Sequence, residues 1–189
     1  MHDWPRAVIG ILWILWAIYW GISALGVKAV RSREPLGSRL LFVIPMVLVA
    51  LLLLVHRGPP WLLALIVPGG WDRYGSGVAL VVVGLGFSVW ARAVLGGNWS
   101  GTVTVKVEHE LVQRGPYRRI RHPIYTGLLF ALLGSGLAAG RIYGLLAFLV
   151  ALIALVRKLR VEERYMEGEF GERYAAYRRS SWALLPWVY

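Results

Sequence analysis

The sequence contains no cysteine, which excludes disulfide bonds, thiol nucleophiles and metal sites built on cysteine. Charged residues are also scarce, at 16% of the 189 residues, whereas a soluble domain carries about a quarter. Asp and Glu are the scarcest of these, at 10 against 21 Lys and Arg. The chain is instead 58% hydrophobic, with ten Trp and nine Tyr, which are enriched at membrane–water interfaces. This composition predicts an integral membrane protein.

The net charge of +11 is compatible with nucleic acid or with an anionic membrane as a partner. Long apolar runs separate the basic stretches, so a bilayer with an anionic leaflet explains the charge better. We therefore expect membrane lipids and no nucleic acid among the partners. His, Asp and Glu residues do not recur at the spacing of metal ligands, so no metal site is expected.

Five apolar runs approach the roughly 20 residues that a membrane-spanning helix needs. They are residues 7–30, 40–55, 78–95, 123–139 and 142–156. A further apolar run, residues 61–67, is too short to span and is enclosed by proline and glycine, so the segment near residues 59–70 is expected to lie in the interface. Gly84 and Gly86 would let a neighbouring helix approach closely, and Gly134 and Gly136 serve packing within or between chains.

The resulting prediction is an all-α integral membrane protein with about five transmembrane helices and a cytoplasmic cofactor pocket. Residues 1–97 would hold the first three helices, and residues 98–189 would form a core around the other two. Within that core, the alternation in residues 99–107 predicts a short strand. The helical spacing of Met166, Phe170, Tyr174 and Tyr177 predicts a C-terminal amphipathic helix on the membrane surface.

The distribution of basic residues predicts the orientation. Three stretches, residues 28–39, 92–121 and 157–179, hold 17 of the 21 Lys and Arg residues, and five spans would place all three on one side. An excess of basic residues marks the cytoplasmic side. We therefore expect the N-terminus outside and the C-terminus and site in the cytoplasm. The compact length is compatible with a prokaryotic cell membrane.

Two polar stretches, residues 109–127 and 157–179, stand out from the apolar sequence, and we expect them to meet at one membrane face. The fourth and fifth apolar runs are joined only by Gly140 and Arg141, so their other ends must lie side by side. Those ends carry His122, Tyr125, Lys158, Arg160, Glu162 and Glu163. Ionisable residues at the mouth of a membrane bundle are costly unless they are paired or functional. Simple pairing of the two Glu residues with the nearby Lys and Arg is the structural alternative to a site.

The motifs in these two stretches resemble one family of membrane enzymes. They are His109-Glu-Leu-Val112, Gly115-Pro-Tyr117, Arg121-His-Pro-Ile-Tyr-Thr-Gly127, Glu162-Glu163 and Phe170-Gly171 followed by Tyr174 and Tyr177. In this order and spacing they resemble the C-terminal core of the isoprenylcysteine carboxyl methyltransferase family, which is related to the phospholipid methyltransferases. The resemblance extends over residues 98–186, and the first three apolar runs match only in being membrane helices.

The resemblance implies S-adenosylmethionine-dependent methyl transfer to a lipid-borne or prenylated carboxylate that enters from the bilayer. The cofactor-binding residues that it implies are His109, Glu110, Leu111, Val112, Tyr117, His122, Pro123, Ile124, Tyr125, Glu162 and Glu163. It also implies a basic residue one helical turn before the first Glu, facing the acceptor carboxylate. Lys158 holds that position, with Arg157 and Arg160 as alternatives.

These residue types suit the implied chemistry. Carboxylate and phenol oxygens accept hydrogen bonds from hydroxyl and ammonium groups, and aromatic faces attract a sulfonium cation. A carboxylate acceptor is already ionised at neutral pH and needs no general base, whereas an amine acceptor would need one. Two other functions remain open: a membrane reductase that uses NADPH, and a non-catalytic membrane subunit or lipid-binding scaffold.

Overall fold

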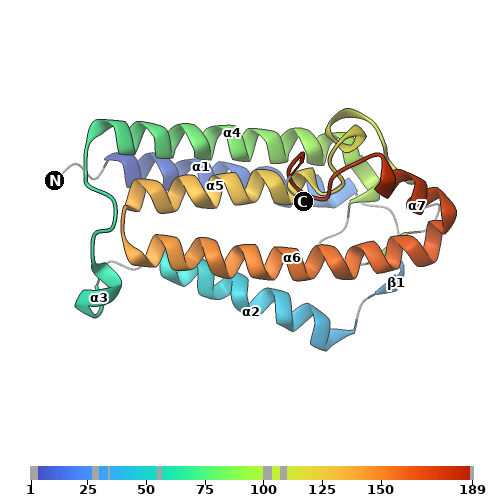
Figure 1. The fold of residues 1–189 in the computed structure, drawn as a ribbon, viewed down its shortest axis with the longest axis horizontal. Helices are drawn as coiled ribbons and strands as arrows, with labels where there is room; N and C mark the ends of the chain where they lie inside the picture. The colour runs from blue at the N-terminus through green and yellow to red at the C-terminus, as the bar shows by residue number, and fades with distance from the viewer. Residues whose placement is uncertain are drawn as a thin grey trace.

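The computed structural model describes residues 4–26, 30–33, 35–54, 57–99, 104–106 and 110–187. Its long helices run along one axis (Figure 1), and they are α1 (Trp4–Ser23), α2 (Leu36–Leu53), α4 (Trp71–Leu95), α5 (Pro123–Ala139) and α6 (Ile142–Phe170). The shorter elements are η1 (Ala24–Gly26), β1 (Val30–Arg33), α3 (Pro60–Leu63), η2 (Gly96–Asn98), β2 (Thr104–Lys106), η3 (Gly115–Arg118) and α7 (Glu172–Arg179). β1 and β2 pair as an antiparallel ladder, so part of the predicted strand in residues 99–107 is confirmed.

Each of the five predicted apolar runs contains a helix, but the first run was drawn too long, because α1 ends at Ser23 and Val30 belongs to β1. Among the described residues, α1, α2, α4 and α6 are long and apolar enough to cross a membrane, whereas α5 is apolar but has only 17 residues. α5 packs against both α4 and α6 and so lies inside the bundle rather than at its edge. The number of helices that cross the bilayer therefore stays a prediction.

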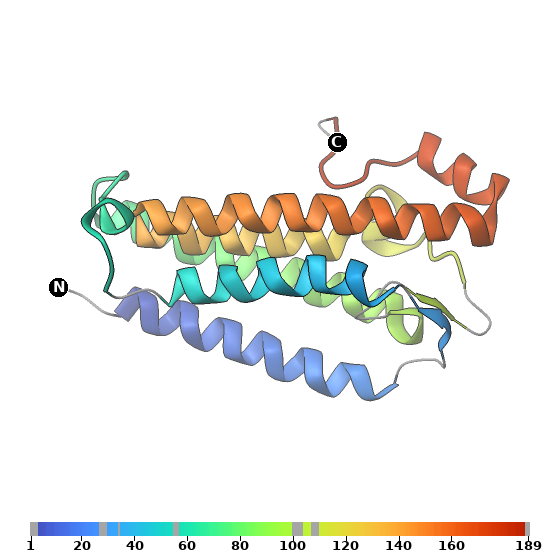
Figure 2. The ribbon, with the colours of Figure 1, turned by 90° about the horizontal axis from the view of Figure 1, so that it is seen from below.

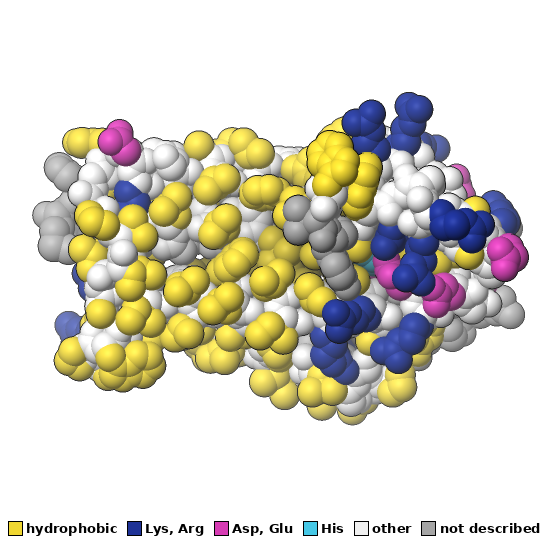
Figure 3. Space-filling view, viewed as in Figure 1, with side chains coloured by type: hydrophobic (Ala, Val, Ile, Leu, Met, Phe, Trp, Pro, Cys, Tyr) yellow, Lys and Arg dark blue, Asp and Glu magenta, His cyan; other side chains and the backbone are white. Residues whose placement is uncertain are grey.

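The bundle has two chemically different ends. One end, called the polar end below, carries β1, β2, η3 and α7, and charged side chains gather there, whereas apolar side chains cover most of the remaining length (Figures 1 and 3). The described parts of the three basic stretches all lie at this end, as predicted for one membrane side.

The opposite end, called the α3 end, carries α3 and the turn between α5 and α6 (Figure 1). The segment near residues 59–70 does not span the bundle. Ile66 N–H donates to Gly140 O at 2.9 Å, and Ile142 N–H donates to Ala64 O at 3.1 Å. These two bonds fix the segment across the α5–α6 turn.

The predicted amphipathic helix is divided between two elements. α6 continues without a break from the apolar run to Phe170, because Arg, Lys, Leu and Glu residues favour helix. It ends at Gly171, whose φ of 51° suits glycine far better than other residues. Tyr174 and Tyr177 then lie on α7 and are buried, at 2% and 5% exposure. The prediction that Met166, Phe170, Tyr174 and Tyr177 lie on one surface helix is therefore wrong.

Glycines set the separation of α4 and α5, the most extensively packed helix pair. A Cβ atom added to Gly84 would lie 2.5 Å from Gly127 O, and one added to Gly134 would lie 2.6 Å from Gly77 O. The predicted role of Gly84 is confirmed. Gly86 faces open space, so the same prediction for Gly86 is wrong. Membrane helices use such small residues to bring their backbones together.

Gly136 and Gly134 face different neighbours within the same chain. A Cβ atom on Gly136 would lie 2.8 Å from Gly144 O of α6, whereas Gly134 faces α4. Both glycines therefore pack against helices of the same chain, which decides between the two alternatives left open by the sequence.

This packing predicts opposite effects for two glycine-to-alanine substitutions on α4. Gly84→Ala should lower the free energy of unfolding by about 1–3 kcal/mol, because the added methyl group meets backbone atoms that cannot move aside. Gly86→Ala, the matched control, should raise it by up to about 1 kcal/mol through helix propensity alone. Thermal unfolding in detergent measures both, and an equal loss in the two variants would contradict the close approach of α4 and α5.

Candidate active site

The chain just before α5 is held by a segment from the far end of the sequence. Arg121 N–H donates to Trp182 O at 2.8 Å, and His122 N–H donates to Ala183 O at 3.0 Å. Trp182 N–H donates in return to Arg119 O at 2.9 Å. These bonds fix the backbone of His122 independently of its side-chain contacts, because backbone donors and acceptors in a buried setting need partners.

The His122 side chain then lies between two carboxylates of α6. Its Nδ1 is 3.4 Å from Glu162 Oε2, and its Nε2 is 3.4 Å from Glu163 Oε1. The imidazole is parallel to the Tyr125 ring within 3°, with 5.5 Å between the centroids. Tyr125 donates its hydroxyl proton to Glu162 Oε1 at 2.5 Å. Residues from α6 and from the start of α5 therefore meet in one cluster, as predicted from the short turn at Gly140 and Arg141.

Glu162 and Glu163 have different partners beyond His122. Glu162 faces Tyr125, whereas Glu163 accepts a hydrogen bond from Arg121 Nε at 2.7 Å and lies 3.8 Å from Arg178 Nε. Arg121 also donates to Ser181 O at 2.5 Å. Glu163 thus belongs to an ionic network that holds α7 and the C-terminal segment. The structural alternative above pairs the two Glu residues with Lys158 and Arg160, whereas the contacts of Glu163 described here are with Arg121 and Arg178.

The cluster changes the protonation of His122. Burial alone would lower the pKa of the His122 imidazole, but the carboxylates of Glu162 and Glu163 beside its two ring nitrogens outweigh it and raise the pKa above the ordinary value of 6.5. The cationic form of the ring is therefore the favoured one beside these carboxylates.

Two buried tyrosines connect the site to α7. Tyr177 donates its hydroxyl proton to the backbone oxygen of Tyr117 at 2.5 Å. Burial raises the pKa of both phenols, so both stay neutral. Tyr117 packs with Val112, Ile124 and Ala91, and the rings of Trp20, Trp99 and Tyr125 surround this group. Four of the residues predicted to bind the cofactor, Val112, Tyr117, Ile124 and Tyr125, thus share one aromatic cluster.

A cavity of about 1220 Å³ begins beside this cluster. Among its lining residues at the polar end are Tyr125 and Lys158. Lys158 is only 6% exposed, and its Nζ lies 4.1 Å from the ring centroid of Phe42 and 5.9 Å from that of Tyr125. A cation held against aromatic rings at the end of a cavity is placed to meet an anionic group.

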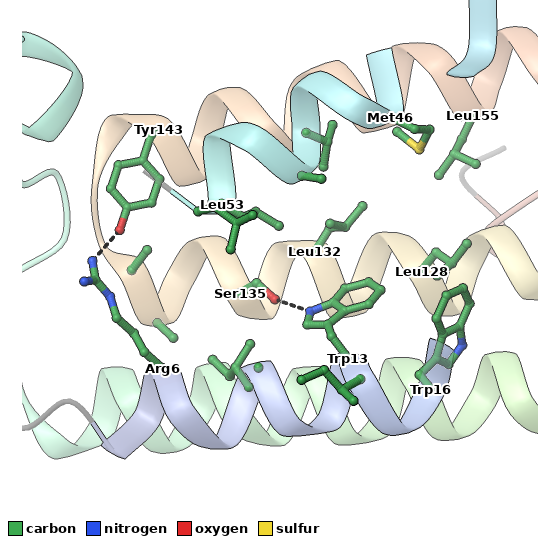
Figure 4. Close-up of a pocket in the computed structure, with 18 of the residues that line it drawn as sticks. Arg6, Trp13, Trp16, Met46, Leu53, Leu128, Leu132, Ser135, Tyr143 and Leu155 are labelled. Atoms are coloured by element: carbon green, nitrogen blue, oxygen red, sulfur yellow. Dashed lines mark hydrogen bonds between the residues drawn. The ribbon is translucent and has the colours of Figure 1, made fainter. Parts of the chain in front are cut away.

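The rest of the cavity is a long apolar space between α1 and α2. α1 packs on α4 and α5, whereas α2 packs on α6, so α1 and α2 line the cavity on two sides and α5 lines it on a third (Figures 1, 2 and 4). Trp13 Nε1 donates to Ser135 Oγ at 3.1 Å, and Trp16 Nε1 donates to Ser88 Oγ at 2.8 Å. These bonds satisfy the indole N–H groups and leave mostly carbon facing the cavity.

The remaining predicted site residues lie in different settings. Pro123 is buried at the start of α5, and Leu111 is half-buried. Glu110 is exposed, and its backbone N–H lies 3.5 Å from Asn98 Oδ1. Arg160 is exposed and does not line the cavity, so geometry favours Lys158 over Arg160 as the basic residue. His109 lies outside the described residues.

Sequence reasoning missed a buried arginine beside the cluster. Arg92 is 3% exposed, donates to Gly96 O at 2.8 Å, and places its guanidinium 4.6 Å from the ring centroid of Trp99. It also donates to Ser23 O and so links the ends of α1 and α4. The sequence feature that could have pointed to Arg92 is its position as an ionisable residue inside an apolar run. Across the described part of the chain, no group of three His, Asp or Glu side chains is arranged to hold a metal ion.

Comparison with known proteins now identifies the family. The model of the phospholipid methyltransferase family matches residues 73–173, more than half of the sequence. The chain belongs to this family of integral membrane proteins. The match begins within α4, earlier than residue 98, where the motif resemblance begins.

Two relatives are isoprenylcysteine O-methyltransferases by name, in agreement with the resemblance to the isoprenylcysteine carboxyl methyltransferases, which is thereby confirmed. A probable protein-S-isoprenylcysteine O-methyltransferase of Oryza sativa subsp. indica is 29% identical over 118 residues, 60% of this chain and 62% of the rice protein. The protein-S-isoprenylcysteine O-methyltransferase of Saccharomyces cerevisiae is 30% identical over 59% of this chain and 48% of its own. The cobalt-zinc-cadmium resistance protein CzcN of Cupriavidus metallidurans is 31% identical over 61% of this chain and 53% of its own. The matched region thus spans about half to three-fifths of these relatives.

A solved structure shares the fold. The eukaryotic intramembrane Ras methyltransferase, an isoprenylcysteine carboxyl methyltransferase, matches 89% of this chain and 52% of its own with a TM-score of 0.57. Sequence identity in this match is 20%, so the likeness concerns the fold alone.

The raised pKa of His122 predicts a pH-dependent stability. A folded pKa above the unfolded value means that the stabilising effect of the protonated ring is complete below the unfolded pKa and is lost as pH rises through the folded pKa. The free energy of unfolding should therefore fall as pH rises above about 6.5, and His122→Gln should reduce this fall. Thermal unfolding across pH tests it, with exposed Arg118→Gln as the control that keeps the wild-type slope. Equal slopes in wild type and His122→Gln would refute the prediction.

Proposed function

We propose that this protein is an S-adenosylmethionine-dependent methyltransferase whose acceptor is the carboxylate of a lipid-borne, isoprenylcysteine-like molecule. The observation that carries this proposal is the apolar cavity that ends at Lys158 and Tyr125, beside the His122 and Glu162 cluster. Such a cavity offers an apolar path to a polar reaction site. The names of the rice and yeast relatives support the same reaction class.

The residues at the polar end fit the cofactor. Trp20, Trp99 and Tyr125 line the cavity at its polar end, and their aromatic rings attract cations. The Glu162 carboxylate accepts hydrogen bonds and is held in place by Tyr125 and His122. When bound, S-adenosylmethionine supplies a methyl group on a sulfonium cation. Glu110, Leu111, Val112, Tyr117, Pro123, Ile124 and Glu163, with His109, complete the proposed binding set by family resemblance.

Lys158 is the residue that we assign to the acceptor carboxylate. Its ammonium group lies inside the cavity near the rings of Phe42 and Tyr125, so it is held at the end that a lipid-borne head group would reach. Lysine provides a compact charge and not the paired donors of arginine, so it attracts the carboxylate without fixing its plane. Because the carboxylate is already ionised, the protein need only align it, and alignment contributes roughly 7–11 kcal/mol in well-oriented systems.

The two rival functions have less support. The matched family and the rice and yeast relatives are methyltransferases in name, and they do not favour the reductase or the non-catalytic scaffold. The orientation proposed with this function places the N-terminus outside and the polar end in the cytoplasm of a prokaryotic cell. The gathering of charged side chains at that one end supports it (Figure 3).

Cofactor binding should depend on Glu162. S-adenosylmethionine at 100 times its Kd should stabilise the purified protein by about 2.7 kcal/mol, and the demethylated product should act similarly. Glu162→Gln should abolish most of this shift, whereas Glu169→Gln, an exposed change on the same helix, should keep it. Differential scanning fluorimetry with each ligand and with NADPH provides the measurement. A shift with NADPH alone would favour a reductase, and no shift with any ligand in folded protein would favour a scaffold.

Acceptor binding should depend on Lys158. Lys158→Gln should raise the KM for a prenylated cysteine acceptor roughly 10- to 100-fold, as expected for the loss of a charge-assisted contact. Binding of S-adenosylmethionine should change little. Arg160→Gln, on the same helix but exposed, should leave the KM near its wild-type value. Steady-state methyl transfer from a labelled donor measures these constants, and a larger effect from Arg160→Gln would reverse the assignment.

A further inference from the structure

The cavity continues far beyond the proposed reaction site. Its lining extends along α5 from Ile124 to Ala139, which is about 22 Å at 1.5 Å per residue. One leaflet of a bilayer offers only about 15 Å of hydrocarbon, half of the core thickness. With the polar end at one membrane surface, as proposed above, a cavity of this length extends past the bilayer midplane. It reaches the α3 end, where its lining includes charged residues.

Arginines line the cavity at the α3 end. This end has four basic residues among those described, namely Arg6, Arg57, Arg73 and Arg141, and all except Arg57 line the cavity. Arginines that only met lipid headgroups would be spread around the rim of the bundle. Their convergence on one cavity from three separate parts of the chain requires another explanation.

Within the described part of the chain, each of these arginines donates one hydrogen bond to the protein, and Arg73 also lies over the Tyr74 ring. Arg6 donates to the hydroxyl of Tyr143 at 2.7 Å, a contact visible in Figure 4, and Arg73 donates to Val67 O at 2.8 Å. Arg141 donates to a backbone oxygen of the interfacial segment. A guanidinium has five N–H donors, so most donors remain available. Arg73 Nε is buried and has no hydrogen-bond partner.

The positive charges at this end are not balanced within the described chain. No ion pair between described residues involves Arg6, Arg73 or Arg141. Asp72, which precedes Arg73 in the sequence, is exposed. Three guanidinium groups beside an apolar cavity thus create a local excess of positive charge, which favours an anionic ligand.

We propose that the α3 end of the cavity binds the phosphate headgroup of an anionic phospholipid, with an acyl chain extending into the apolar space. Guanidinium groups match phosphate oxygens through paired hydrogen bonds. The contiguous apolar lining explains why the anion is attached to a lipid and is not free phosphate. This site lies at the opposite end from Lys158 and does not depend on the proposed methyl transfer.

Lipid binding to the purified, delipidated full chain tests the proposal. The ligands are phosphatidylglycerol, diacylglycerol with the same acyl chains, and inorganic phosphate, and Trp fluorescence or native mass spectrometry reports binding. Phosphatidylglycerol should bind at least about tenfold more tightly than diacylglycerol, because only the former has a phosphate. Inorganic phosphate at the same concentration should neither bind nor compete.

Variants locate the site. Arg6→Gln and Arg141→Gln should each weaken phosphatidylglycerol binding by about fivefold or more, because each removes charge-assisted donors. Arg57→Gln, which removes a charge from the same end but outside the cavity, should have no effect. The proposal is overturned if the three variants bind like wild type, if Arg57→Gln weakens binding as much as the other two, or if inorganic phosphate competes fully. No cofactor or acceptor is present in this test, so its outcome is separate from that of the methyl-transfer experiments.

Discussion

Glu162 and Glu163 sit side by side on α6 where the helix leaves the apolar bundle, and two adjacent carboxylates in such a place need cationic or donor partners. The partners come from three parts of the chain: His122 and Tyr125 at the start of α5, Arg121 just before it, and Arg178 on α7. Removing one member of a buried charge cluster typically costs about 3–5 kcal/mol, because the other members lose their compensation. The position of α5 along α6, the return of α7 toward the bundle and the shape of the polar end all follow from this one requirement.

The cavity has a complementary origin in the glycine contacts of the bundle. Gly77 and Gly84 of α4 meet Gly127 and Gly134 of α5 with almost no space between the backbones, so these two helices form a dense unit. α1 and α2 then pack on different helices, α1 on α4 and α5 and α2 on α6. The space left between them is lined by large aromatic and aliphatic side chains that do not close it. Close packing on one side of α5 thus coexists with a long open space on its other side.

Local sequence patterns were sufficient for the helices and for much of the site. Apolar runs located five helices, and the turn at Gly140 and Arg141 correctly brought His122 and Tyr125 to Glu162. The C-terminal segment was not predictable in this way, because the bonds from Arg121 and His122 to Trp182 and Ala183 join residues about 60 positions apart without a local periodicity. The boundary at Gly171 was missed, because the helical spacing of Met166, Phe170, Tyr174 and Tyr177 continues across the break between α6 and α7. His109 lies outside the described residues, so its role stays a prediction.

The pairing of the C-terminal segment with the turn before α5 also orders events during biosynthesis. Synthesis proceeds from the N-terminus, so α5 and α6 are made before Trp182 and Ala183, and His122 lacks its backbone partner from this segment until those residues emerge. Two backbone bonds and the burial of Ala183 and Leu184 are then added. The polar end is therefore the last part of the described bundle to be completed during synthesis.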